Sequence, residues 1–146
     1  MVNIITGHEG EFLVGMLLSF VLGFVVGAER ESRGKSAGIA THVFVIGGSM
    51  LFTMISINLN PLESSRIAAQ IVTGIGFLGA GIILKADGGT IKNLTTAASI
   101  WFSAAIGMAI GFQWYFIAVI AGLFAVFIPR IPHVKDQHPE LANKSK

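Results

Sequence analysis

The sequence predicts an all-α fold, a polytopic membrane bundle of five transmembrane helices. Hydrophobic residues make up 53% of the 146 positions and charged residues only 12%, with a mean hydropathy of +0.73. Runs without any charge recur along the chain, and each is close to the roughly 20 apolar residues that cross a hydrocarbon layer. The basic residues stand at the ends of these runs, where they act as topology signals.

Each charge-free run gives one expected span. The run from Asn93 to Pro129 is too long for a single crossing, and we expect Gly111-Phe-Gln-Trp114 to divide it into two shorter helices. No basic segment precedes the first run and no small-residue cleavage site follows it, so we expect no removable signal peptide. The expected spans are residues 12–28, 39–59, 67–84, 94–110 and 112–128, which form a transmembrane domain over residues 1–129, followed by a short cytoplasmic tail over residues 130–146.

The positions of the Lys and Arg residues predict the orientation. With five spans and the N-terminus outside, nine of the ten cations lie on the cytoplasmic side and only Arg66 lies outside. A single long helix over residues 93–129 would leave five cations on each side. We therefore expect five spans with the N-terminus out and the C-terminus in.

Small residues recur at every fourth position in two spans and cluster in a third. In lipid, such stripes let helix backbones approach closely, either within one chain or between copies. We favour packing within the chain and also expect a homo-oligomer, most simply a dimer. Gly74, Gly76 and Gly79 also spell the G-x-G-x-x-G pattern of a dinucleotide-binding turn, but no acid follows about 20 residues later. The stripes are Gly15, Ser19, Gly23 and Gly27, then Ser99, Ser103, Gly107 and Gly111, and the cluster is Gly74, Gly76, Gly79 and Gly81.

Polar residues at the ends of the spans and inside them are the candidate functional residues. Under the expected topology, two charged loops and the start of the second span share the cytoplasmic face, where they could contact a partner or an ion. No Asp or Glu lies in the middle of a span, which argues against a buried carboxylate relay for protons. The candidates at the cytoplasmic face are Glu29, Arg30, Glu31, Arg33, His42 and Asp87, and those within or bordering the membrane are Arg66, Gln70, Thr73, Thr95 and Thr96.

Two classes of function are disfavoured. The cations are spread over the ends of the spans and do not form one basic face with interleaved aromatic residues, so nucleic acid is not an expected partner. The chain has no Cys, no nucleophile elbow and no Ser beside a His base, so we do not expect an enzyme.

Two segments resemble the signature of the MgtC/SapB family of bacterial inner-membrane proteins. The first is Gly27-Ala-Glu-Arg-Glu-Ser-Arg-Gly-Lys-Ser-Ala-Gly-Ile-Ala-Thr-His42. The second runs from Arg66 to Gly81 and on through Asn93-Leu-Thr-Thr-Ala-Ala-Ser-Ile-Trp101. The family usually has Arg at the position of Ala40, Asp-Pro near Glu63-Ser64 and Gly at the position of Asn93. Many members also carry a soluble C-terminal domain, and we expect no counterpart of it in this sequence.

The resemblance implies an inner-membrane protein linked to magnesium homeostasis. Members of the family are associated with survival at low magnesium, and the best-studied one with restraint of the F-type ATP synthase. Two hypotheses follow. The first is a regulatory protein that docks a membrane partner such as this synthase. The second is an oligomeric pathway for Mg²⁺ or another cation. In this hypothesis Glu29, Glu31 and Asp87 form an inner ring of oxygen ligands, and the passage is lined by Gln70, Thr73, Thr95 and Thr96. No bound cofactor is expected, with Mg²⁺ as the one candidate.

Overall fold

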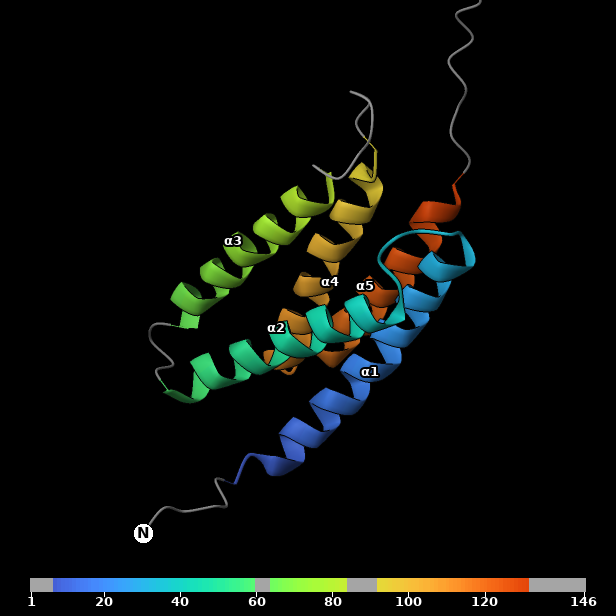
Figure 1. Ribbon diagram of the computed structural model, residues 1–146. Helices are drawn as coiled ribbons and strands as arrows, with labels where there is room; N and C mark the ends of the chain where they lie inside the picture. Colours follow the sequence, from blue (N-terminus) through green and yellow to red (C-terminus); the bar gives the residue numbers. More distant parts are fainter. Residues whose placement is uncertain (1–6, 60–63, 84–91, 132–146) are drawn as a thin grey trace, which may run out of the picture.

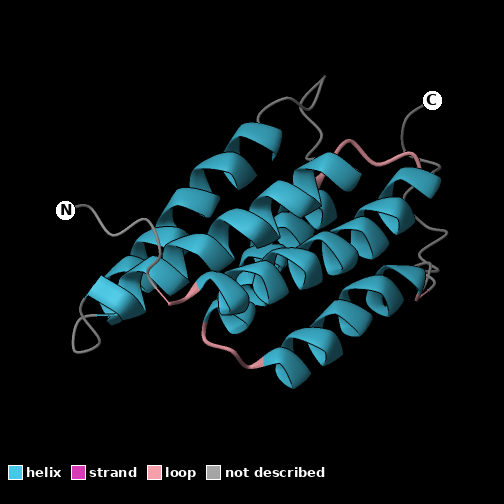
Figure 2. Cartoon of the chain, turned by 90° about the horizontal axis from the view of Figure 1, so that it is seen from below, coloured by secondary structure: helices cyan, strands magenta, loops and turns pink. Residues whose placement is uncertain are grey.

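The computed structural model describes residues 7–59, 64–83 and 92–131, and in this part of the chain the regular structure is helical (Figures 1 and 2). This confirms the predicted all-α class with five helices. Four of them are long and apolar enough to cross a membrane, and the fifth is apolar but shorter. The helices are α1 (Glu9–Ser32), α2 (Ile39–Leu59), α3 (Ser64–Ile83), α4 (Leu94–Gly111) and α5 (Tyr115–Phe127), and the 3₁₀ turn η2 (Ile128–Arg130) continues α5.

Helix α1 is longer than the charge-free run that predicts it. It starts at Glu9, with Glu11 also in its first turn, and Arg30 lies in its last turn. Acidic residues at the N-terminus and basic residues at the C-terminus of a helix interact favourably with its macrodipole. Helical structure therefore continues past Ala28, and Glu29 and Arg30 become part of the helix that contacts the rest of the bundle.

The small-residue stripe of α1 packs against α2. A Cβ atom added to Gly23 would lie 2.6 Å from the Cα atom of Val43, and one added to Gly27 would overlap the backbone of Ile39. Gly15 faces the side chain of Met50. Only glycine permits the α1 and α2 backbones to approach this closely, so the first stripe serves packing within the chain.

The stripe of α4 packs against the other side of α2. A Cβ atom on Gly107 would overlap the carbonyl oxygen of Ile46, and one on Gly111 would lie 2.6 Å from the Cβ atom of Thr53. The Ser103 side chain is fully buried, and its hydroxyl donates to the Ser99 carbonyl oxygen at 2.9 Å. Helix α2 is thus the central helix, with α1 and α4 packed on it (Figure 1).

Helix α3 lies at the edge of the bundle and is the least buried of the four long helices. Its Ile71 and Ile75 pack with Ile100 and Ala104 of α4. A Cβ atom on Gly79 would lie 3.7 Å from Ala97, whereas Cβ atoms on its other three glycines would meet nothing within 4 Å. No other described part of the chain therefore packs on most of the α3 glycines, unlike the stripes of α1 and α4, which contact α2. These three glycines are Gly74, Gly76 and Gly81.

Candidate functional site

The ends of α1 and α5 and the starts of α2 and α4 lie at one end of the bundle (Figure 1). Charged residues gather at this end. The turn between α1 and α2 is fixed there by Glu31, whose Oε1 atom accepts a hydrogen bond from the backbone N–H of Ile39 at 2.8 Å. Early backbone N–H groups of a helix have no partner within the helix, so this carboxylate caps α2. The predicted residue Glu31 therefore has a structural task in this arrangement.

Glu29 is a buried carboxylate surrounded by cations. Its side chain is 3% exposed, and its Oε1 atom lies 3.6 Å from Nη1 of Arg33 and 3.9 Å from Nε of Arg130. Neither carboxylate oxygen accepts a hydrogen bond from the described residues. A buried charge is tolerated only when opposite charges compensate for its lost hydration. Arg33, which directly follows α1, and Arg130, in the 3₁₀ turn η2, supply that compensation.

Arg30 connects α1 to α4. The residue is 1% exposed, and its Nη2 atom donates to Oγ1 of Thr96 at 3.4 Å. Its Nε atom has no partner among the described residues. Thr96 is also 1% exposed, so this bond is shielded from solvent and lipid. Two residues predicted separately, one from a charged loop and one from a span, thus lie in direct contact.

His42 lies at the start of α2 and is fully buried. Its Nδ1 atom is 2.8 Å from the carbonyl oxygen of Gly38, which can only accept, so Nδ1 carries the proton of this bond. Nε2 has no partner among the described residues. The ring thus completes the first turn of α2, next to the end of α1.

The remaining predicted residues are exposed on α3 or α4 or lie outside the described structure. Thr95 is exposed on α4, and Arg66, Gln70 and Thr73 are exposed on α3. The Thr73 hydroxyl donates to the Ala69 carbonyl oxygen of its own helix at 3.0 Å. Asp87 lies outside the described residues. Thr95 and Thr96, adjacent in sequence, face different surroundings, so the polar residues of α3 and α4 do not line one common path in the chain.

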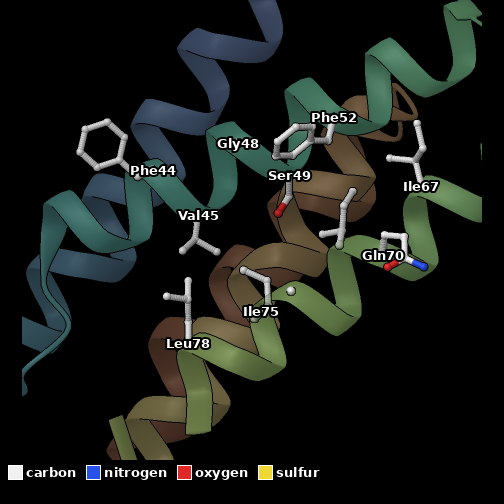
Figure 3. A pocket seen from close by; sticks show the side chains of 11 residues that line it. Phe44, Val45, Gly48, Ser49, Phe52, Ile67, Gln70, Ile75 and Leu78 are labelled. Carbon is white, nitrogen blue, oxygen red and sulfur yellow. The ribbon is translucent and has the colours of Figure 1, made fainter. Parts of the chain in front are cut away.

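Gln70 borders an apolar groove between α2 and α3 (Figure 3). The groove has a volume of about 530 Å³, and Ser49 of α2 is among its polar lining residues. Its other walls are mostly aliphatic and aromatic. The lining residues are Phe44, Val45, Gly48, Ser49, Phe52, Ile67, Gln70, Ile71, Gly74, Ile75 and Leu78.

The charged end is poorly suited to a divalent cation. Mg²⁺ takes oxygen ligands, commonly one or two carboxylates with several waters. Glu29 is already paired with Arg33 and Arg130, whose charges would repel a metal ion, and Glu31 caps a helix. Among the described residues, no group of three or more His, Cys, Asp or Glu side chains could hold a metal ion.

Arg130 is the functional candidate that the sequence did not single out. It was one of several cations counted for orientation, and its pairing with Glu29 spans 101 positions of the chain. The available signal was its place directly after Pro129, at the end of the last apolar run and on the same predicted side as Glu29.

With this geometry in place, comparison with known proteins gives the family. The profile of the MgtC family matches residues 16–134. The chain belongs to the MgtC family. The resemblance inferred from its two motif segments is therefore confirmed, and these segments hold Glu29, Arg30, His42 and Thr96, which meet at the charged end.

Several members of the family are similar over most of this chain. The putative magnesium transporter YhiD of Escherichia coli K12 is 41% identical over 132 residues, which cover 84% of this chain and 61% of that protein. The protein MgtC of Salmonella typhimurium LT2 is 43% identical over 100 residues, covering 68% of this chain and 43% of that protein. The uncharacterized protein slr0014 of Synechocystis is 43% identical over 122 residues, covering 83% and 51%. The chain thus spans about half the length of these relatives. No solved structure matches it.

Proposed function

We propose that this MgtC family protein regulates a membrane partner by docking it within the bilayer, and that the partner is the F-type ATP synthase. The proposal extends to this chain the magnesium-linked regulatory role that the family resemblance implies. The main structural support is the outer surface of α3. This helix offers a polar side chain and open glycines to another helix, while the stripe glycines of α1 and α4 pack inside the chain.

The α3 docking face consists of Gln70, Gly74, Phe77 and Gly81. Spacings of four, three and four residues place them on one side of a helix. Phe77 is 81% exposed, and both glycines leave open space above them. Helices associate in lipid through small residues that allow close approach, and this face has that composition.

Gln70 adds a chemical reason for a partner. Its amide is exposed on an apolar helix and makes no hydrogen bond to another described residue. Lipid tails cannot supply such a bond, and an amide without one costs free energy in an apolar medium. A partner helix with a donor or acceptor at this depth would satisfy the Gln70 amide.

Site-specific crosslinking tests the proposal. A photoreactive phenylalanine analogue replaces Phe77 of α3 or, as the control, Phe116 of α5, which is similarly exposed at 78%. Membranes are irradiated after growth at limiting magnesium, and the adducts are identified by mass spectrometry. We expect an adduct with a membrane subunit of the ATP synthase from position 77 and none from position 116.

Two glycine variants make the test specific for the docking face. Gly74 and Gly76 are both exposed with open space around them, but two residues apart they point to opposite sides of α3. Gly74→Leu should therefore remove the adduct and Gly76→Leu should retain it. An adduct made only of two copies of this chain would establish a homodimer and contradict docking of the synthase, as would no protein adduct at all.

A cation transporter is the second candidate, because the relative YhiD of Escherichia coli bears the name putative magnesium transporter. The pairing of Glu29 with Arg33 and Arg130 weighs against it. Purified protein in liposomes with an entrapped Mg²⁺ indicator separates the two functions. Under an inward Mg²⁺ gradient we expect vesicles as tight as protein-free ones, and entry that saturates with Mg²⁺ concentration would favour transport.

A further inference from the structure

A second groove lies between α4 and α5, away from the α3 docking face. Its volume is about 270 Å³, and its walls are almost entirely apolar. The ring of Phe102 packs against that of Phe124 with 5.5 Å between centroids. The groove is lined by Thr95, Ala98, Ser99, Trp101, Phe102, Phe124, Ala125, Ile128 and Pro129. Its shape and chemistry suit a hydrocarbon chain lying along the bundle.

Two arginines stand at one end of this groove. Nη1 of Arg33 donates a hydrogen bond to the carbonyl oxygen of Pro129, a groove-lining residue, and Arg130 is the next residue along the chain. The Arg130 guanidinium also lies over the ring of Phe127, 5.9 Å from its centroid. The side chains of Arg33 and Arg130 are 40% and 57% exposed. Both cations therefore reach the surface where the groove ends.

The charges of the four residues in the cluster around Glu29 do not balance. Glu29 is the carboxylate in contact with both arginines, and its side chain is 3% exposed. Arg30, the next residue, adds a third guanidinium nearby, and this one is buried. Three cations against one anion leave a net charge of +2 on these four residues. An anion that approaches from the membrane surface would restore the balance, and guanidinium groups bind phosphate oxygens with matching geometry.

We propose that the α4–α5 groove and the exposed guanidinium groups of Arg33 and Arg130 form a binding site for one anionic phospholipid. An acyl chain lies in the groove, and the phosphate of the headgroup contacts the two arginines at the end of the spans, where headgroups are found. Basic pockets between transmembrane helices bind anionic lipid headgroups in this manner. The site does not depend on the proposed function, because the α3 docking face shares no residue with it.

Tryptophan fluorescence tests the site directly. Trp101 lines the groove, and the only other tryptophan, Trp114, precedes α5 at the opposite end of the bundle. In the Trp114→Phe chain, quenching of Trp101 by lipids with brominated acyl chains reports lipid in the groove. We expect brominated phosphatidylglycerol to be preferred over brominated phosphatidylcholine, with about fivefold preference for each arginine that contacts the headgroup.

Charge variants on this background separate the site from general attraction. Arg33→Gln with Arg130→Gln should abolish the preference, whereas Lys35→Gln, which removes one exposed charge from the same end, should retain it. Equal quenching by both lipids in the Trp114→Phe chain would overturn the proposal. Equal losses in the Lys35 and arginine variants would also overturn it.

A further variant and a soluble competitor test the site without the arginine variants, which could misfold. Ala98→Phe fills the groove and leaves both arginines in place, and it should reduce quenching by the anionic lipid. Unchanged quenching in this variant would contradict an acyl chain in the groove. Millimolar inorganic phosphate should not displace the lipid, and displacement would indicate a site for free phosphate and refute the lipid site.

Discussion

Arg30 donates a hydrogen bond from Nη2 to Oγ1 of Thr96 across 3.4 Å, although 66 positions separate the two residues in the chain. Both are 1% exposed. The bond joins the last turn of α1 to the first turn of α4, so two segments that carry the family signature are held together at the charged end. The free energy of this hydrogen bond is therefore the most direct measure of how strongly α1 and α4 are held together at the charged end.

Thr96→Val should destabilise the protein by about 1–2 kcal/mol. The substitution keeps the shape of the side chain but leaves the buried Arg30 guanidinium without its hydrogen-bond acceptor. Hydrogen bonds to charged groups are stronger than those between neutral groups, although hydrogen bonds between membrane helices average only about 0.6 kcal/mol. Thr95→Val is the matched control and should change stability by less than about 0.5 kcal/mol, because Thr95 is exposed. Reversible unfolding in mixed detergent micelles measures both, and equal effects would contradict a stabilising role for the Arg30–Thr96 bond.

The number of helices and their approximate positions could be predicted from the sequence because both depend on apolar length. The ends of the helices depend on more than hydropathy. The first span was predicted to stop at Ala28, the residue before the first charge that follows the run, but α1 continues to Ser32, and Glu29 and Arg30 within it are buried. Charge alone does not reveal whether a side chain lies in water or beneath a neighbouring helix.

Contacts between distant segments were the part of the site that could not be predicted. The place of Arg130 directly after the last span puts it on the same predicted side as Glu29, but the sequence pattern does not show that the two side chains meet. Asn93, where the family usually has Gly, is a difference that the local backbone conformation explains. Its φ of 64° is left-handed, a conformation that glycine, usual in the family at this position, adopts freely and Asn tolerates.

Gly23→Ala should cost about 1–3 kcal/mol, the usual penalty for forcing an extra group into a packed interface. The new Cβ atom would lie 2.6 Å from the Cα atom of Val43, so α1 and α2 would have to separate. Gly76→Ala is the control on α3, where a Cβ atom meets nothing within 4 Å and alanine favours the helix by about 0.5–1 kcal/mol. Thermal unfolding of the two variants in one detergent should therefore move in opposite directions, and a stabilising Gly23→Ala would refute the close α1–α2 packing.

Glu29→Gln should destabilise the protein more than Arg130→Gln. Removing the buried carboxylate takes the compensating charge away from Arg30, which is 1% exposed, and breaking a buried ionic group of this kind costs about 3–5 kcal/mol. Arg130 is 57% exposed and can turn to water, so its loss should cost no more than about 1 kcal/mol. Unfolding of the single and double variants gives the coupling energy between the two residues. A smaller cost for Glu29→Gln than for Arg130→Gln would show that Glu29 is not needed as an anion.

Cysteine labelling should place the charged end in the cytoplasm. The chain has no cysteine, so single substitutions report one position each. Lys35 is exposed in the turn after α1 at the charged end, and Gln113 is exposed in the turn before α5 at the other end. Because cations are retained on the inner side, a membrane-impermeant maleimide should label Gln113→Cys in right-side-out vesicles and Lys35→Cys only after permeabilisation. Ser103→Cys, buried on α4, should stay unlabelled in both conditions and report intact packing.

The reverse labelling pattern would place the charged end and the C-terminus outside the cell and remove the expected cytoplasmic face from the docking proposal. The lipid site would remain, since its groove and its two arginines stay at one end of the bundle in either orientation.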